Sequence, residues 1–329
     1  MITPGKRDRS ALFVTWERHR RTRELAHTFG ARLVEISAPR VRQPLLRYPW
    51  LLARTAWHIA RRRPDVLLVQ CPSILLGAWC VVLRPIFRYT LIADLHNEAV
   101  VPFNYSFGLY RSLLLFIRRG ADISLVSNEA LERIVVRSGG RAFVLPDKVP
   151  DLQPGATVTA QGDSPCVVLI CTFAPDEPVR EVIDAARLLP GVRLLVTGNA
   201  RGFRDTTSLP ANVTLTGFLD DAAYVALLKQ ADVLIDLTRM DNCLVCGAYE
   251  AVALQKPLVT SDTHVLRAHF SRGTVFTQHD PESLAAAIGQ ALADRDRLAH
   301  EMRVLKRELR DRWSAQGREL GRIVQLEVR

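Results

Sequence analysis

Residues 236–262, DLTRMDNCLVCGAYEAVALQKPLVTSD, decide the fold of the second half of the chain. The run ADVLIDL, which overlaps its start, has the length and apolar character of a buried strand, and KPLVTSD begins a second apolar run. Between the two runs, the apolar residues at helical spacing are Leu244, Ala248, Ala251 and Leu254. This spacing predicts a helix over 243–255 with one buried face. The order strand, loop, helix and strand is typical of a parallel α/β sheet.

Glu250 lies in the middle of this predicted helix, among small and apolar residues. An ionised carboxylate in that position needs a partner, because burying it unpaired is energetically expensive. The hydroxyl groups of a ligand are one such partner, so Glu250 is a candidate binding residue. The alternative is a structural helix with one incidental glutamate.

The same stretch resembles the donor-binding segment of GT-B glycosyltransferases, in particular the group related to bacterial mannosyl- and glucosyltransferases. That group carries two glutamates with seven residues between them, followed by small residues and G-K-P-V-V. Glu250 matches the second glutamate, which holds the nucleotide ribose in the family, and KPLV at 256–259 matches the end of the pattern. Asn242, beside Asp241, stands at the position of the first glutamate. The resemblance therefore carries over the role of the second carboxylate only.

Length and composition indicate a two-domain protein with an anionic partner. The chain has 329 residues, more than a single small core needs, and its 48% hydrophobic share excludes a disordered chain. Its formal net charge is +10. This excess favours phosphates, an anionic membrane surface or nucleic acid as partners, while a solvated basic surface is the simpler alternative.

Two strand–helix alternations, separated by a stretch rich in Pro, Gly, Ser and Thr, indicate two lobes. We expect an acceptor-binding lobe at 1–152, a linker at 153–163 and a nucleotide-sugar-binding lobe at 164–310. The resemblance implies that a terminal helix at 311–329 packs back on the first lobe. The expected fold class is α/β, with two Rossmann-like, doubly wound lobes (GT-B) and a cleft between them.

Three loops of the second lobe follow predicted strands. The candidate donor-binding residues in them are Thr172, Gly198, Asn199, Arg201 and Gly217. Gly198 allows close approach of the backbone to a ligand, and Arg201 can pair with phosphate. The loops contain neither a P-loop nor a G-x-G-x-x-G fingerprint. The resemblance implies that they line the donor base or diphosphate.

The resemblance also implies that Arg239 and the helix start at 241–243 face the donor diphosphate. Arg239 would then stabilise the departing diphosphate, an electrostatic form of catalysis. Asp241 and Asn242 are expected in the donor site, where a helix N-terminus favours anions. No D-x-D motif stands where a metal-dependent GT-A enzyme would carry one, so we expect no metal and no other cofactor. The nucleotide sugar is a substrate.

The first lobe contributes candidates for proton transfer and acceptor binding. His96 and Glu98 follow a predicted strand, and either is a candidate general base on an acceptor hydroxyl. The alternative is that neighbouring polar residues cap the turn and His96 only packs. Arg18, His19 and Arg21 follow the first predicted strand and are candidates for binding an anionic acceptor such as a pyrophosphate. An exposed basic helix start is the alternative.

Two stretches bear on membrane contact. Residues 66–83 reach membrane-spanning length, but Pro72 and Ser73 divide them into a strand and a helix start. Residues 106–120 predict a basic amphipathic helix, which either lies on an anionic membrane or faces the core. With the tryptophan-bearing helix predicted at 45–63, the basic first lobe suggests a lipid-linked acceptor at the inner face of the membrane.

The six cysteines indicate a reduced, cytosolic protein rather than a disulfide framework. Cys243 and Cys246 form a lone C-x-x-C without a second ligand pair, which favours packing over a zinc site. The N-terminal residues do not read as a secretory signal.

The resemblance, together with these observations, implies a glycosyltransferase that moves a sugar from a nucleotide-diphosphate donor to a glycan acceptor, which the first lobe suggests is lipid-linked. We expect it in the cytoplasm, peripheral on the inner membrane face, in polysaccharide or glycolipid synthesis. The alternatives are a sugar-nucleotide epimerase of the same fold and a non-catalytic basic protein that binds anionic membrane or nucleic acid. Nucleic acid is not an expected partner, because the arginines match no recognised nucleic-acid module.

Overall fold

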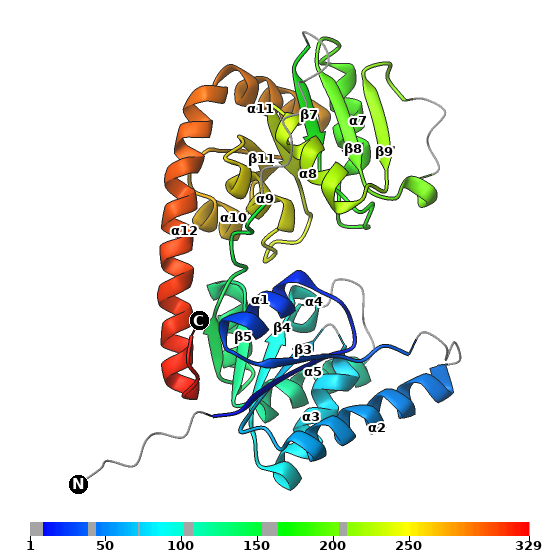
Figure 1. Cartoon of the computed structure of the whole chain (residues 1–329). Helices are drawn as coiled ribbons and strands as arrows, with labels where there is room; N and C mark the ends of the chain where they lie inside the picture. The colour runs from blue at the N-terminus through cyan, green and yellow to red at the C-terminus, as the bar shows by residue number, and fades with distance from the viewer. Residues whose placement is uncertain are drawn as a thin grey trace, which may run out of the picture. The chain divides into compact units, whose positions relative to one another are not determined.

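The chain folds as two compact units, each described here by itself (Figure 1). The computed structural model describes residues 9–38, 44–71, 73–101, 108–152, 164–203 and 209–328. Unit 1 comprises Met1–Lys148 and Arg312–Arg329, and unit 2 comprises Val149–Asp311. The linker predicted at 153–163 lies outside the described residues.

Unit 1 is built on a six-stranded sheet in the order β2-β1-β3-β4-β5-β6, and all its strands run parallel. The strands are β1 (Ala11–Thr15), β2 (Arg32–Glu35), β3 (Val66–Cys71), β4 (Thr90–Leu95), β5 (Ile123–Val126) and β6 (Ala142–Val144). The order reverses between β1 and β3. In doubly wound sheets ligands bind at the carboxyl ends of the strands beside this reversal.

Helices cover both faces of this sheet. They are α1 (Arg20–Thr28), α2 (Pro44–Arg62), α3 (Ile74–Phe87), α4 (Asn97–Val100), α5 (Gly108–Gly120), α6 (Glu129–Arg137) and the end of α12 (Arg295–Val324). Because successive strand side chains point to opposite faces, Leu12 and Val14 join a core with α2, α3, α5 and α6. Phe13 packs instead with α1 and with Trp313 and Leu320 of α12.

Unit 2 contains a second six-stranded parallel sheet, in the order β12-β11-β10-β7-β8-β9. The strands are β7 (Cys166–Leu169), β8 (Arg193–Thr197), β9 (Val213–Gly217), β10 (Val233–Asp236), β11 (Leu258–Ser261) and β12 (Thr274–Thr277). Counted from β7, this is the strand order of a Rossmann fold, with its reversal between β7 and β10. The predicted α/β class with two doubly wound lobes is confirmed.

The helices of unit 2 pack against this sheet. They are α7 (Val179–Arg187), η1 (Ala200–Gly202), α8 (Asp221–Gln230), α9 (Cys246–Leu254), α10 (His264–His269), α11 (Pro281–Ala293) and the first part of α12. α7 and α11 contact each other over a core that includes Val167, Ile235 and Val259. α9 contacts β10 and β11, and α8 contacts β7. The stretch quoted first, 236–262, therefore forms the centre of unit 2.

Two predicted helix boundaries were wrong. The helix predicted over 243–255 begins at Cys246, because Val245 has an extended backbone and Asp236 accepts the N–H of Gly247 in the first turn. The terminal segment predicted at 311–329 belongs to unit 1 from Arg312 onward, but its helix begins earlier, because α12 runs without interruption from Arg295 to Val324. Within 66–83, residues 66–71 form β3 and residues 74–83 belong to α3. Within the described ranges, no helix is both long and apolar enough to cross a membrane.

Candidate active site

The loop after β7 lies at the strand-order reversal of unit 2 and is shaped by one carboxylate. The backbone N–H groups of Thr172 and Ala174 both donate to Oε2 of Glu177 at 2.8 Å. Phe173, between them, has a positive φ of 62°. The predicted donor-binding residue Thr172 therefore sits in a turn that Glu177 holds in a strained conformation. Sequence reasoning missed Glu177, although it stands only five residues after Thr172 and is therefore close enough to bond back to the loop.

Gly198 brings the loop after β8 against the loop after β7. Its φ is +99°, and a Cβ atom added there would lie 2.3 Å from the carbonyl oxygen of Cys171. Only glycine fits both conditions. The next residue, Asn199, accepts a hydrogen bond from the N–H of Arg201 at 3.2 Å through its side chain, which caps η1.

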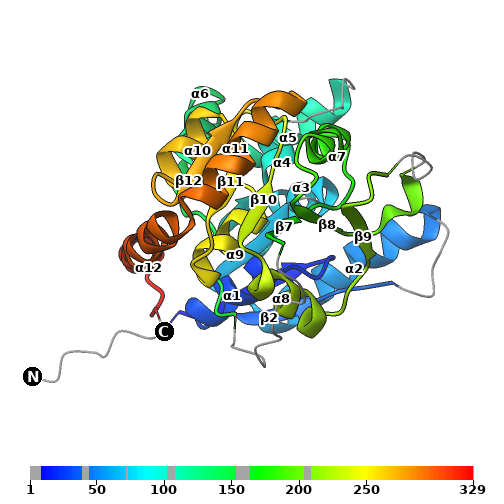
Figure 2. The same cartoon turned by 90° about the horizontal axis from the view of Figure 1, so that it is seen from above.

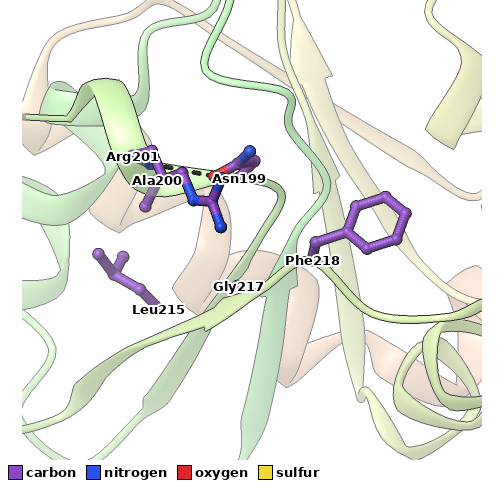
Figure 3. Close-up of a pocket in the computed structure, with 6 residues that line it drawn as sticks. All are labelled: Asn199, Ala200, Arg201, Leu215, Gly217 and Phe218. Atoms are coloured by element: carbon purple, nitrogen blue, oxygen red, sulfur yellow. Dashed lines mark hydrogen bonds between the residues drawn. The ribbon is translucent and has the colours of Figure 1, made fainter.

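A pocket of about 660 Å³ opens beside this loop. It is lined by Asn199, Ala200, Arg201, Leu215, Gly217 and Phe218. Figure 3 shows Asn199 and Arg201 together on the β8 loop, next to the end of β9 that carries Leu215 and Gly217. Three of the predicted donor-binding residues, Asn199, Arg201 and Gly217, thus line one pocket. Phe218 is 85% exposed and adds an aromatic surface to the cation and the amide.

Glu250 is buried, and a protein group supplies at least one of its partners. Its side chain is 9% exposed, and the hydroxyl of Tyr224 donates to its Oε2 at 2.6 Å. Tyr224 lies in α8 and Glu250 in α9, so this bond joins the two helices. Sequence reasoning did not find Tyr224, because the residues are 26 positions apart and no local pattern connects them.

Asp236, at the end of β10, is a second buried carboxyl that sequence reasoning missed. It accepts the N–H of Gly247 at 2.6 Å, and a Cβ atom at Gly247 would lie equally close to the same oxygen. Burial raises the pKa of Asp236 well above its usual value, and the N–H groups of Gly247 and Ala248 offset part of this effect. Asp236 therefore fixes the start of α9, on which Glu250 stands.

Arg239 extends from the loop after β10. Its Nη2 lies 2.6 Å from Oε1 of Glu181, and both side chains are partly exposed. The loop is held by Thr238, whose N–H donates to Ser261 at 2.9 Å and whose hydroxyl donates to Asp176 at 2.7 Å. Arg239 thus lies just beyond the carboxyl end of β10, and it shares its charge with Glu181.

The predicted helix start at 241–243 needs correction. Asp241 and Asn242 form a turn that precedes α9, with Asp241 exposed and Asn242 half-buried. Cys243 is half-buried and Cys246, the first residue of α9, is exposed. All six cysteines are free thiols. Among the described residues, no group of three or more His, Cys, Asp and Glu side chains is arranged to hold a metal ion.

A second polar cluster lies at the carboxyl ends of β1, β3 and β4 in unit 1. Thr15 and Gln70 are joined by a side-chain hydrogen bond of 2.6 Å, and Nε2 of Gln70 lies 3.4 Å from Nε2 of His96. The rings of His96 and His19 meet edge to face with their centroids 4.8 Å apart. Burial, reinforced by His96, lowers the pKa of His19. Two predicted residues thus come together at the reversal of this sheet.

The prediction that Arg21 binds the acceptor was wrong, because Arg21 is a buried structural cation. Its Nε donates to Asp94 at 2.9 Å, its Nη1 to Asp147 at 2.7 Å and its Nη2 to the carbonyl of Leu145 at 2.8 Å. All three nitrogens are therefore occupied within the protein. Burial would raise the pKa of Asp147, but the charge and hydrogen bond of Arg21 outweigh it and lower that pKa.

The remaining predicted residues of unit 1 lie around this cluster. Arg18 is exposed, and its Nε lies 3.5 Å from Glu35. Glu98 belongs to the short helix α4, and the described side chains do not include its own. Asp94 lies near the end of β4, with a carboxylate oxygen 3.8 Å from Nε2 of His96. Of the two predicted general-base candidates, His96 is the one whose side chain the structure describes.

Comparisons with known proteins identify the class of this protein. Residues 157–320, about half of the chain, match the sequence model of the family described as "Glycosyl transferases group 1". A sequence search of curated proteins finds no significant match.

The structure is similar to that of sucrose-phosphate synthase from Thermosynechococcus elongatus, with a TM-score of 0.71, 19% identity, and 90% of this chain and 83% of that chain covered. It is similar to Anabaena HepE in complex with UDP, with a TM-score of 0.74, 14% identity, and 96% and 99% covered. It also resembles a putative UDP-N-acetylglucosamine 2-epimerase from Listeria monocytogenes, with a TM-score of 0.60, 14% identity, and 89% and 91% covered.

The fold is therefore GT-B, and the segment 157–320 carries the glycosyl transferase group 1 domain. The protein is a GT-B glycosyltransferase that uses a nucleotide sugar.

Proposed function

We propose that unit 2 binds the nucleotide-diphosphate part of the sugar donor in and around the pocket of Asn199, Arg201 and Gly217, and that the sugar is transferred to a lipid-linked glycan. One observation carries this proposal. Residues from separate loops, singled out for donor binding, line one pocket within the segment that matches the transferase family. The pocket offers a cation for phosphate and, in Phe218, an aromatic surface for a base.

Uridine nucleotides are the donors to test first. HepE has been solved in complex with UDP, with UDP and glucose, and with UDP-glucose, and its fold aligns with 95–96% of this chain. In the proposed complex Glu250 binds the ribose hydroxyls, as the family resemblance implies, and Tyr224 orients the carboxylate. In the same complex, the loop backbone at Thr172 and Gly198 approaches the donor from the other side of the site.

The negative charge that develops on the departing diphosphate needs compensation. We assign this role to Arg201 and Arg239. The turn at Asp241 and Asn242 adds no positive charge, and Asp236 already accepts the N–H of Gly247 in the first turn of α9. Arg239 is paired with Glu181 at 2.6 Å, so its guanidinium is oriented but only partly neutralised. The proposal assigns no metal and no other cofactor to this step.

The acceptor is assigned to unit 1. His96, at the strand-order reversal beside His19, is the first candidate to take the proton from the acceptor hydroxyl if transfer inverts the anomeric configuration. Glu98 is the second candidate. Arg18 is the remaining predicted cation for an anionic acceptor such as a lipid pyrophosphate. A lipid-linked acceptor would make this a polysaccharide or glycolipid enzyme working at the cytoplasmic membrane face.

The other two functions considered have less support. A UDP-N-acetylglucosamine 2-epimerase is among the similar structures, so the fold alone does not separate epimerisation from transfer. The match of 157–320 to a transferase family favours transfer. The same match disfavours a non-catalytic basic protein.

Thermal unfolding with UDP, GDP and their sugars tests the donor site. At about a hundred times its dissociation constant a ligand adds about 2.7 kcal/mol, which raises the melting temperature of a domain of this size by roughly 5–10 °C. We expect a shift with uridine nucleotides that shrinks in Glu250→Gln. The matched control, Glu282→Gln, changes an exposed glutamate of unit 2 and should keep the full shift. Equal shifts in both variants, or none with any nucleotide, would contradict the proposal.

A further inference from the structure

The helices α2, α3 and α5 contain arginines but no acidic residues, and all their arginines except the buried Arg118 are at least partly exposed. Four of the arginines lie in α2, one in α3 and three in α5. The whole chain has 34 acidic residues against 44 Lys and Arg, and α7, α8, α11 and α12 each contain acidic residues. The three helices are therefore a local concentration of positive charge.

The three helices form one continuous surface. They cover the same face of the unit 1 sheet, since Leu51 of α2, Leu76 of α3 and Leu114 of α5 belong to one core. α3 contacts both α2 and α5, and the three lie next to one another in Figures 1 and 2. We call their outward side the α2–α3–α5 face.

This face also exposes large apolar side chains. Nine of the thirteen large hydrophobic residues that are exposed in the described part of the chain lie on it: Leu46, Tyr48, Trp50, Trp57, Leu75, Val82, Ile86, Leu109 and Phe116. Leu109 is 74% exposed and Ile86 67% exposed. Soluble proteins rarely gather apolar residues in this way unless the surface binds a partner.

Along α2 the charged and aromatic groups are interleaved. Trp50, Arg54, Trp57 and Arg61 recur at helical spacing, so they form one stripe. The guanidinium of Arg54 lies 5.7 Å from the ring centroid of Trp50 and 4.8 Å from that of Trp57, and Arg61 lies 5.7 Å from Trp57. The stripe thus holds indole rings and guanidinium groups next to one another. Aromatic and basic side chains are favoured together at the boundary between lipid headgroups and hydrocarbon.

We propose that the α2–α3–α5 face docks the protein on an anionic lipid bilayer. The docking is argued from the surface itself. Only its role, which is to bring the enzyme to a lipid-linked acceptor, rests on the proposed function. The arginines suit anionic headgroups, and the apolar side chains suit the acyl boundary beneath them. A nucleic acid would satisfy the arginines but would leave aliphatic groups such as Ile86 and Leu109 without a partner. A second copy of the face would oppose arginine to arginine.

The docking surface is larger than the helix predicted at 106–120. In α5 the apolar residues Leu109 and Phe116 are exposed. Arg118 of the same helix is buried instead, and it donates to the carbonyls of Ala99 and Val100. That helix therefore contributes an edge of the face, while the aromatic and basic stripe lies on α2.

Vesicle flotation of the full-length protein tests the docking. We expect binding to vesicles of phosphatidylcholine with phosphatidylglycerol, little binding to phosphatidylcholine alone, and release by salt. The charge variant Arg47→Gln, Arg54→Gln and Arg61→Gln should weaken binding by about fivefold for each arginine. The matched control removes the same charge from α12 in unit 1: Arg312→Gln, Arg318→Gln and Arg322→Gln. Equal losses in the two variants would overturn the assignment of the surface.

The apolar contribution is tested separately. Ile86→Ser with Leu109→Ser should weaken binding to anionic vesicles by roughly tenfold or more, because each side chain loses buried apolar area. Ile323→Ser, on exposed α12, should leave binding unchanged. Retained vesicle affinity in the double variant, or tighter binding to an oligonucleotide than to anionic vesicles, would overturn docking on a bilayer.

Failure here and failure of the proposed function give different results. The surface variants should keep the stabilisation by uridine nucleotides, since the donor pocket belongs to unit 2. Wild-type protein that is stabilised by UDP but floats with no vesicle overturns the docking alone. Protein that binds vesicles but no nucleotide overturns the donor site alone.

Discussion

The Nε–H group of Arg21 donates to Oδ1 of Asp94 at 2.9 Å, and the two side chains are only 8% and 1% exposed. The same guanidinium reaches Asp147 at 2.7 Å. This buried cation therefore ties the end of β4 to the last residues of unit 1 before the chain enters unit 2. Removing the guanidinium would leave the carboxylates of Asp94 and Asp147 without their common cationic partner.

We expect Arg21→Met to lower the free energy of unfolding by about 3–5 kcal/mol, since breaking a buried ion pair leaves unpaired charge. Arg23→Met is the matched control. Arg23 is 55% exposed and pairs with Glu35 at 3.0 Å, so its loss should lower the free energy of unfolding far less, because solvent screens an exposed ion pair. Urea unfolding monitored by tryptophan fluorescence measures both. Comparable losses in the two variants would contradict a special role for Arg21.

The pH dependence of this difference has a definite sign. The pKa of Asp147 is lowered in the folded protein, so its ion pair stabilises the fold above the ordinary carboxyl value of 3.8. That contribution is lost as the pH falls through the lowered value. The gap between wild type and Arg21→Met should therefore shrink in acid.

The bond between Tyr224 and Glu250 predicts a second effect. Tyr224→Phe removes one donor from a carboxylate that is 9% exposed, and the free energy of unfolding should fall by about 1.5–3 kcal/mol. Under the proposed function, uridine nucleotide affinity should fall as well, because the carboxylate is no longer oriented. Tyr48→Phe, on the more exposed α2 surface, is the control for loss of a hydroxyl. Calorimetric titration with UDP that finds no difference between the variants would separate Tyr224 from the donor site.

The sequence predicted the fold well because its signal is periodic. A buried strand needs a run of apolar residues such as ADVLIDL, and a helix with one buried face needs apolar residues at helical spacing, as around Glu250. These requirements leave a pattern that can be recognised in the sequence alone. Boundaries that depend on a distant group were less predictable. Asp236 accepts the N–H of Gly247 and sets the start of α9 at Cys246, and no local pattern announces that bond.

The same reason explains what was found and missed in the sites. Asn199 and Arg201 follow β8, and Gly217 ends β9. Parallel strands bring their carboxyl ends to one edge, so the gathering of these residues was predictable. Arg21 resembled its exposed neighbours Arg18 and Arg20 in sequence. Only the fold reveals that the first turn of α1 points Arg21 at Asp94 and Asp147, which lie 73 and 126 positions away.

Gly198 predicts a loss that depends on backbone geometry. Gly198→Ala would place a methyl group 2.3 Å from the carbonyl oxygen of Cys171 at a φ of +99°, so the loop must shift. We expect the free energy of unfolding to fall by more than about 1 kcal/mol, and nucleotide affinity to fall because this loop lines the pocket. Gly191→Ala, where an added Cβ meets nothing within 4 Å, should change stability by less. Urea unfolding that ranks the two variants in the opposite order would contradict the role of Gly198.

His19 predicts a dependence of stability on mildly acidic pH. Burial, with a smaller contribution from His96, lowers the pKa of His19 below its ordinary value of 6.5, although Asp147 and Asp94 oppose this. The unfolded chain therefore takes up a proton on His19 more readily than the folded protein does. The stabilisation is fully present above pH 6.5. It declines as the pH falls from there through the lowered folded value, and then levels off.

His19→Gln removes this titration and keeps a polar side chain of similar reach. Between pH 7.5 and pH 5.5, wild-type protein should lose more free energy of unfolding than the variant, whatever the variant's stability at pH 7.5. His300→Gln, at an exposed position of α12, should lose as much as wild type over the same interval. A variant that loses as much as wild type would mean that the imidazole of His19 is protonated equally in both states. The folded protein would then tolerate a protonated imidazole at His19, beside His96. Binding of an anionic acceptor at this place would require such a positive charge.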